Sequence, residues 1–201
     1  MRIAMIGSGY VGLVSGACLS EFGHEVVCID KDQGKIADLN RGSVPIFEPG
    51  LDEVVAANAR AGRLSFTTDL APAVAQADAV FIAVGTPSRR GDGHADLSFV
   101  FGAAEEIARA LGHYTVIVTK STVPVGTGKK VEDIIRKIRP EAEFDVASNP
   151  EFLREGSAIE DFRRPDRIVV GAETEPARCG CAPSDSSALP VKLSARSSGP
   201  Y

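Results

Sequence analysis

The stretch Gly7-Ser8-Gly9-Tyr10-Val11-Gly12 decides how the amino-terminal part of this chain folds. It follows a short apolar run, Arg2–Ile6, and it opens a segment, Tyr10–Phe22, whose apolar residues recur every three or four positions. These patterns indicate a strand, a tight turn and a helix. A second apolar run, Glu25–Ile29, ends at the carboxylate of Asp30. A glycine turn between a strand and a helix, with an acid about twenty residues further on, is typical of a dinucleotide-binding unit.

Each residue of this pattern has a physical task in binding a dinucleotide. Gly7 permits the tight turn, Gly9 lets a pyrophosphate approach the backbone, and Gly12 lets the helix pack on the strand. The free N–H groups at the start of the helix then face the phosphates. Asp30 can accept hydrogen bonds from ribose hydroxyls, which favours NAD over NADP, although Lys35 weakens that preference. The alternative is a glycine turn that serves packing alone.

Strand and helix patterns alternate along the rest of the chain. Such alternation predicts an α/β fold of the Rossmann type, with a doubly wound, mainly parallel sheet and helices on both faces. Ligands of such sheets bind at the carboxyl ends of the strands. The further strand predictions are Leu64–Thr67, Ala79–Val84, Tyr114–Thr119, Phe144–Ala147 and Arg167–Val170, and the further helix predictions are Gln33–Asn40, Leu51–Ala61, Ala71–Ala77, Leu97–Leu111 and Gly126–Ile138.

Composition narrows the class of protein. The chain is 44% hydrophobic and 24% charged, and its net charge of −5 includes no basic run, so neither a nucleic-acid partner nor an electrostatic membrane anchor is expected. No apolar stretch is long enough to span a bilayer, which predicts a cytoplasmic protein. Cys18 and Cys28 lie in a predicted helix and strand, where cysteine is usually a small apolar residue. Cys179-Gly180-Cys181 has no second pair of ligands, so no metal site is expected.

Two strand ends carry hydroxyl groups. Thr86 follows the strand Ala79–Val84, where it could bond a ribose or phosphate oxygen, although a Thr-Pro pair also suits a plain turn. Ser121 and Thr122 follow the next strand, where they could orient a water molecule or a nicotinamide ribose. The alternative for this second segment is helix capping by Thr127 and burial of the other hydroxyls.

A third strand end is followed by the run from Asn149 to Ala158, which contains Glu151 and Glu155. On a helical turn, two carboxylates four residues apart would share one face and could meet the same substrate. One of them could then act as a general base or position a water molecule. The alternative is an acidic turn exposed to solvent.

Five motifs in this order resemble the amino-terminal half of the UDP-glucose/GDP-mannose dehydrogenase family: GSGYVG, VGTP, KSTVPVGT, NPEFLREGSA and PDRIVVG. The resemblance covers residues 1–177, which would form one NAD-binding Rossmann-like domain. It implies oxidation of the C6 alcohol of a UDP-sugar to a carboxylate, by two successive hydride transfers to NAD through a cysteine thioester. The run REGSAIEDFRRPDRIVVG most resembles the members that convert UDP-glucose to UDP-glucuronate. A relative acting on GDP-mannose or a UDP-aminosugar, and a non-catalytic NAD-binding module, remain alternatives.

The resemblance also implies roles for single residues. Thr122 and Glu151 would position the hydrolytic water or transfer protons. Glu151 would also line the UDP-sugar site. The other implied roles follow the family motifs: the cofactor-binding residues would be Gly7, Gly9, Tyr10, Val11, Gly12, Asp30, Lys35, Thr86, Ser121 and Glu155, and the remaining substrate-binding residues would be Phe152, Leu153 and Arg154.

The chain departs from the family pattern after about residue 177. The family's nucleophilic cysteine lies in a GGSCFPKD-like segment that this chain does not contain, and the long central helix that builds the family's homo-oligomers is absent. Residues 178–201 have no helical or strand period, which predicts an irregular or disordered tail, and the abrupt change suggests a shifted reading frame or a truncated product. We therefore expect NAD binding without oxidation of UDP-glucose, because the thioester step needs a thiolate.

Overall fold

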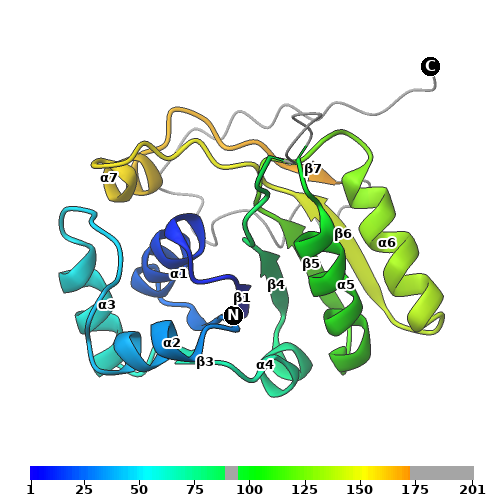
Figure 1. Ribbon diagram of the computed structural model, residues 1–201, viewed down its shortest axis with the longest axis horizontal. Helices are drawn as coiled ribbons and strands as arrows, with labels where there is room; N and C mark the ends of the chain where they lie inside the picture. The colour runs from blue at the N-terminus through cyan, green and yellow to red at the C-terminus, as the bar shows by residue number, and fades with distance from the viewer. Residues whose placement is uncertain (89–94, 173–201) are drawn as a thin grey trace.

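A single sheet runs through the molecule (Figure 1). The computed structural model describes residues 1–88 and 95–172. Within them the strand order is β3-β2-β1-β4-β5-β6-β7, and all neighbours are parallel except β6 and β7. The predicted Rossmann-type sheet is confirmed. The strands are β1 (Arg2–Ile6), β2 (Glu25–Ile29), β3 (Leu64–Thr67), β4 (Ala79–Ile82), β5 (Thr115–Thr119), β6 (Phe144–Ser148) and β7 (Gly171–Ala172).

Helices cover both faces of this sheet. Successive side chains of a strand point to opposite faces, so Ile3 and Met5 of β1 belong to one apolar cluster while Ala4 and Ile6 belong to the other. The first cluster lies under α1, α2, α3 and α7, and the second under α4, α5 and α6 (Figure 1). The helices are α1 (Tyr10–Glu21), α2 (Gln33–Asn40), α3 (Leu51–Arg60), α4 (Leu70–Gln76), α5 (Ser98–Ala110), α6 (Thr127–Ile138) and α7 (Ala158–Arg163).

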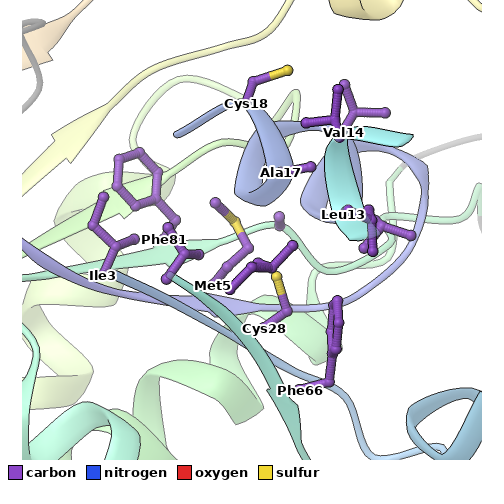
Figure 2. Close-up of a cluster of buried hydrophobic side chains, with 14 of the residues drawn as sticks. Ile3, Met5, Leu13, Val14, Ala17, Cys18, Cys28, Phe66 and Phe81 are labelled. Atoms are coloured by element: carbon purple, nitrogen blue, oxygen red, sulfur yellow. The ribbon is translucent and has the colours of Figure 1, made fainter. Parts of the chain in front are cut away.

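Both cysteines of the described chain are buried in the apolar cluster around α1. In Figure 2, labelled side chains of α1 lie on one side of the interface and those of the strands on the other. A Cβ atom on Gly16 would lie 2.6 Å from the Sγ atom of Cys28, so the helix can approach this closely only because residue 16 has no side chain. Burial raises the pKa of Cys18 and of Cys28 to about 12. Their predicted role as small apolar residues is confirmed.

One sequence prediction in the last part of the fold is wrong, and one helix was not predicted. Residues 167–170 do not form a strand, and the pairing with β6 occurs at Gly171–Ala172 instead. A Cβ atom on residue 171 would lie 2.5 Å from the Oγ atom of Ser148, so the two backbones can approach each other where glycine leaves space. The helix α7 was not predicted, because its six residues are too few to show a helical period in the sequence.

Part of the predicted organisation lies outside the described residues. This holds for residues 173–177 of the predicted domain, for the predicted tail 178–201, and for Cys179 and Cys181. Among the described residues, no helix has the length and apolar character needed to cross a bilayer.

Candidate functional site

The glycine turn lies between β1 and α1, and its three glycines differ in what surrounds them. Gly7 has a φ angle of +100°, and a Cβ atom there would lie 2.7 Å from the carbonyl oxygen of Ala83. A Cβ atom on Gly12 would lie 1.8 Å from the carbonyl oxygen of Gly7, whereas one on Gly9 would meet nothing within 4 Å. Packing therefore explains Gly7 and Gly12 but not Gly9.

The open space at Gly9 adjoins the start of α1. Gly9 is the N-cap residue, no side chain caps the helix, and its first turn holds no acidic residue. Backbone N–H groups at an uncapped helix start attract phosphate, and the helix dipole adds to that attraction. The geometry fits a pyrophosphate brought close to the backbone at Gly9, which is the task that the sequence pattern predicts for this residue.

Asp30 follows β2 and is already engaged within the protein. Its Oδ2 atom accepts hydrogen bonds from the backbone N–H of Ser8 at 2.9 Å and from Nζ of Lys35 at 2.8 Å, and its Oδ1 atom accepts one from the N–H of Asp32 at 3.0 Å. Burial alone would raise the pKa of Asp30, but these hydrogen bonds outweigh it and lower the pKa. The carboxylate is charged, and Lys35 balances its charge beside the turn.

The ends of β4 and β5 bring the predicted hydroxyl groups to the same edge of the sheet. Ser121 donates a hydrogen bond from Oγ to the carbonyl oxygen of Val84 at 2.7 Å, which ties the two strand ends together. Thr122 is exposed and Thr86 is half-buried. The alternative in which Thr127 caps the helix is wrong, because Gly126 is the N-cap of α6 and the hydroxyl of Thr127 donates to the carbonyl oxygen of Pro124.

Strand pairing shows that the two predicted catalytic residues follow adjacent strands of the sheet. Thr119 of β5 pairs with Ser148 of β6, so Thr122 and Glu151 each lie three residues beyond this last pair. Asn149, directly after β6, accepts a hydrogen bond from Nζ of the buried Lys120 at 3.1 Å, which joins the ends of the two strands. The two residues therefore leave adjacent strands at the ligand-binding edge of the sheet.

The loop that follows β6, residues 151–157, is not the helical turn on which we expected two carboxylates to share a face. Residues 151–154 have no regular structure, and α7 begins only at Ala158. Glu151 instead folds back on the loop, where its Oε2 atom accepts a hydrogen bond from the backbone N–H of Leu153 at 2.6 Å. Glu155 is exposed. The paired-carboxylate expectation is wrong because Glu151 bonds the loop backbone and Glu155 precedes the helix.

The remaining predicted substrate residues of this loop make specific contacts. The guanidinium of Arg154 binds both carboxylate oxygens of Asp161 in α7, at 3.1 Å from Nε and 2.6 Å from Nη2. Three of its five N–H groups stay outside this pair, so the exposed side chain can still bind an anion. Phe152 is half exposed, and the guanidinium of Arg167 lies 4.5 Å from its ring centroid.

A buried carboxylate that the motifs do not contain joins this loop to the glycine turn. Glu48, between α2 and α3, is 6% exposed. It accepts hydrogen bonds from the hydroxyl of Tyr10 at 2.5 Å and from the backbone N–H groups of Gly156 at 2.7 Å and Ala158 at 2.8 Å. Spacing could not reveal it, because the loop lies more than one hundred residues further along the chain.

Protonation states at this junction follow from the same contacts. Burial alone would raise the pKa of Glu48, but hydrogen bonds from Tyr10, Gly156 and Ala158 outweigh it and lower the pKa. Burial and the Glu48 carboxylate raise the pKa of Tyr10, so the phenol keeps its proton and donates a hydrogen bond to the carboxylate. The same hydroxyl lies 3.4 Å from the carbonyl oxygen of Arg154, so the predicted cofactor turn and the predicted substrate loop lie side by side.

Comparison with known proteins identifies the family to which this chain is similar. Residues 1–183 match the family described as "UDP-glucose/GDP-mannose dehydrogenase family, NAD binding domain". The UDP-glucose 6-dehydrogenase of Rhizobium meliloti (strain 1021) is 68% identical over 173 residues, which cover 86% of this chain and 40% of that protein. The chain thus spans less than half the length of this curated relative.

Solved structures show the same fold at lower identity. A UDP-glucose dehydrogenase from Pyrobaculum islandicum has 45% identity and a TM-score of 0.85, over 89% of this chain and 42% of that one. A GDP-mannose dehydrogenase from Pseudomonas aeruginosa has 39% identity and the same TM-score, over 89% and 42%. The chain therefore belongs to the UDP-glucose/GDP-mannose dehydrogenase family and carries its NAD-binding domain.

Proposed function

We propose that this chain is the cofactor-binding half of a dehydrogenase that oxidises UDP-glucose to UDP-glucuronate, with residues 1–177 as its NAD-binding domain. One observation carries the proposal: the open space at Gly9 lies at the start of α1, whose Tyr10 meets the loop 151–157 through Glu48. A dinucleotide at the turn and a sugar nucleotide at the loop would then be neighbours. The identity to UDP-glucose 6-dehydrogenases supports the choice of substrate.

The turn and the strand ends supply the NAD site in this proposal. Gly9, Tyr10 and Val11 offer backbone N–H groups to the pyrophosphate, and the charged Asp30 with Lys35 faces the adenosine ribose. NAD supplies the hydride acceptor of the reaction. Thr86, Ser121 and Glu155 complete the cofactor site, which is supported by the position of Thr86 and Ser121 at the ends of β4 and β5.

The loop 151–157 supplies one side of the UDP-sugar site. Arg154 keeps N–H groups for a phosphate outside its pair with Asp161, and Phe152 offers a half-exposed ring. Leu153 contributes its backbone and partly buried side chain. Thr122 and Glu151, which leave adjacent strands, orient a water molecule or carry a proton between the sugar and solvent.

The described residues do not supply the nucleophile that a thioester mechanism needs. Cys18 and Cys28 are buried in the core, and burial raises the pKa of each thiol to about 12. Neither can present a thiolate to a sugar at the edge of the sheet. We therefore propose that the chain binds NAD and UDP-glucose but does not oxidise the sugar alone.

Two alternatives have an observation in their favour. The equal TM-score of a GDP-mannose dehydrogenase supports a different sugar nucleotide. The burial of both described thiols supports a non-catalytic NAD-binding module.

Calorimetric titration of the chain with NAD, UDP-glucose and GDP-mannose, together with a spectroscopic assay for NADH, separates these readings. The proposal expects NAD and UDP-glucose to bind, GDP-mannose to bind more weakly, and no NADH to form. Tighter binding of GDP-mannose than of UDP-glucose would support GDP-mannose as the substrate. NAD binding without any sugar-nucleotide binding would support the non-catalytic NAD-binding module. NADH formation would contradict the proposal that the chain does not oxidise UDP-glucose alone.

A further inference from the structure

Glu48 differs from the other charged groups around the loop 151–157 in where its hydrogen bonds lead. Glu151 bonds the backbone of Leu153, and Asp161 bonds Arg154, so both of these contacts lie within residues 151–161. Glu48 comes from the connection between α2 and α3 and bonds Gly156 and Ala158. Its contacts therefore hold the loop to the dinucleotide-binding unit rather than to itself.

We propose that Glu48 is a positioning residue, which fixes the loop 151–157 against the first turn of α1 and so sets the affinity for the sugar nucleotide. The inference rests on the proposed function, because it takes this loop as one side of the UDP-sugar site. Glu48 itself touches neither ligand in this account. It acts through Tyr10 on one side and through Gly156 and Ala158 on the other.

The distribution of donors over the carboxylate makes this role sensitive to a single atom. The Oε2 atom of Glu48 accepts from Tyr10 and Gly156, and the Oε1 atom accepts from Ala158. All these groups donate, so both carboxylate oxygens must accept. A buried backbone N–H that loses its acceptor favours conformations in which it can reach water. Removing one oxygen should therefore release either Gly156 or Ala158, both at the carboxyl end of the loop.

The variant Glu48→Gln removes one acceptor with almost no change in shape. Whichever way the amide is turned, its NH₂ group faces either Gly156 or Ala158, while Tyr10 can adapt by rotating its hydroxyl. We expect amide hydrogen exchange to rise at least about tenfold at one of the two residues in Glu48→Gln, and at both in Glu48→Ala. Glu53→Gln, an exposed carboxylate in the first turn of α3, is the matched control and should leave both amides protected.

Ligand binding tests whether this is positioning or only general stability. UDP-glucose and NAD are titrated separately into the unmodified chain, Glu48→Gln and Glu53→Gln. Positioning of the loop predicts that Glu48→Gln weakens UDP-glucose binding about tenfold and NAD binding less than about threefold, because Glu155 is the one loop residue placed in the proposed cofactor site. A parallel loss of both affinities with a lower Tm would show a structural role and overturn the inference.

The two measurements, hydrogen exchange and ligand titration, also separate this inference from the proposed function. If the unmodified chain bound no UDP-glucose, the proposed substrate would be contradicted, and the exchange measurement would still decide what Glu48 holds. Unchanged protection of both Gly156 and Ala158 in Glu48→Ala would overturn the inference whatever the chain binds. Raised exchange at these amides, with UDP-glucose affinity lowered much more than NAD affinity, would support it.

Discussion

The glycine turn and the loop 151–157 meet at the same edge of the sheet, yet different forces hold them. The turn is fixed by close packing, since a Cβ atom on Gly7 or Gly12 would overlap backbone atoms. The loop is fixed by charged side chains, with Glu48 and Asp161 accepting hydrogen bonds from its backbone. The turn should therefore be sensitive to added atoms and the loop to lost charge.

The largest effect that this comparison predicts is for Gly12→Ala. Its Cβ atom would lie 1.8 Å from the carbonyl oxygen of Gly7, so α1 must move away from β1. We expect a loss of about 3 kcal/mol in the free energy of unfolding. Denaturant unfolding measures it, with Gly9→Ala as the matched control, because that Cβ atom meets nothing and the φ of −77° suits alanine. Equal losses for the two variants would contradict the packing account.

Acidification should release the loop while the turn stays packed. Hydrogen bonds from the side chain and the backbone N–H of Arg154 lower the pKa of Asp161 from the usual 3.8 to about 2. The stabilisation is fully present above about pH 4 and is lost as the pH falls through about 2. Hydrogen exchange at Arg154 should rise over this range, after correction for the intrinsic pH dependence.

The variant Asp161→Asn removes the titrating group from this pair. It should show the faster exchange of Arg154 at neutral pH already, and little further change down to pH 2. An acid-dependent rise of the same size in this variant would show that another group opens the loop.

A smaller chemical effect is expected for the buried thiols of α1 and β2. Because burial raises the pKa of Cys18 and Cys28 to about 12, a thiol reagent at pH 8 should leave both unlabelled in the folded chain and label both in denaturant. Mass spectrometry of the two peptides measures the labelling. Rapid labelling of Cys18 in the folded chain would contradict the claim that neither thiol can act as a nucleophile.

The smallest effect is expected for Ser15→Ala. The hydroxyl of Ser15 is buried in α1 and has no hydrogen-bond partner among the described residues. Its removal should leave stability unchanged or raise it by up to about 1 kcal/mol. The matched control is Ser20→Ala in the same helix, which should be destabilised because its hydroxyl donates to the carbonyl oxygen of Ala17. Thermal unfolding of both variants shows whether each substitution raises or lowers the stability of the chain.

The sequence predicted the packed region better than the polar one, for a physical reason. Apolar periods are local signals, so the strand Arg2–Ile6 and the helix Gln33–Asn40 were predicted with the bounds that the structure has. The packing tasks predicted for Gly7 and Gly12 also agree with their surroundings, while the phosphate-binding task of Gly9 stays a prediction.

The polar region was harder because its partners are distant in the sequence. Glu48 lies in a connection without any period, and Gly156 and Ala158 contribute only backbone groups, which every residue has. The loop was expected to hold Glu151 and Glu155 on one helical face, but Glu151 bonds the N–H of Leu153 instead. Competition between side-chain and helical hydrogen bonds is decided by tertiary contacts, which spacing does not show.

Calorimetric titration with NAD tests most directly the central claim, that the space at Gly9 is a cofactor site. The unmodified chain is compared with Gly9→Val, whose Cβ atom would meet nothing within 4 Å and whose methyl groups extend from that open position. We expect one NAD per unmodified chain, and binding lost in Gly9→Val while its Tm stays close to that of the unmodified chain. Equal NAD binding by both proteins, or none by either, would contradict the account.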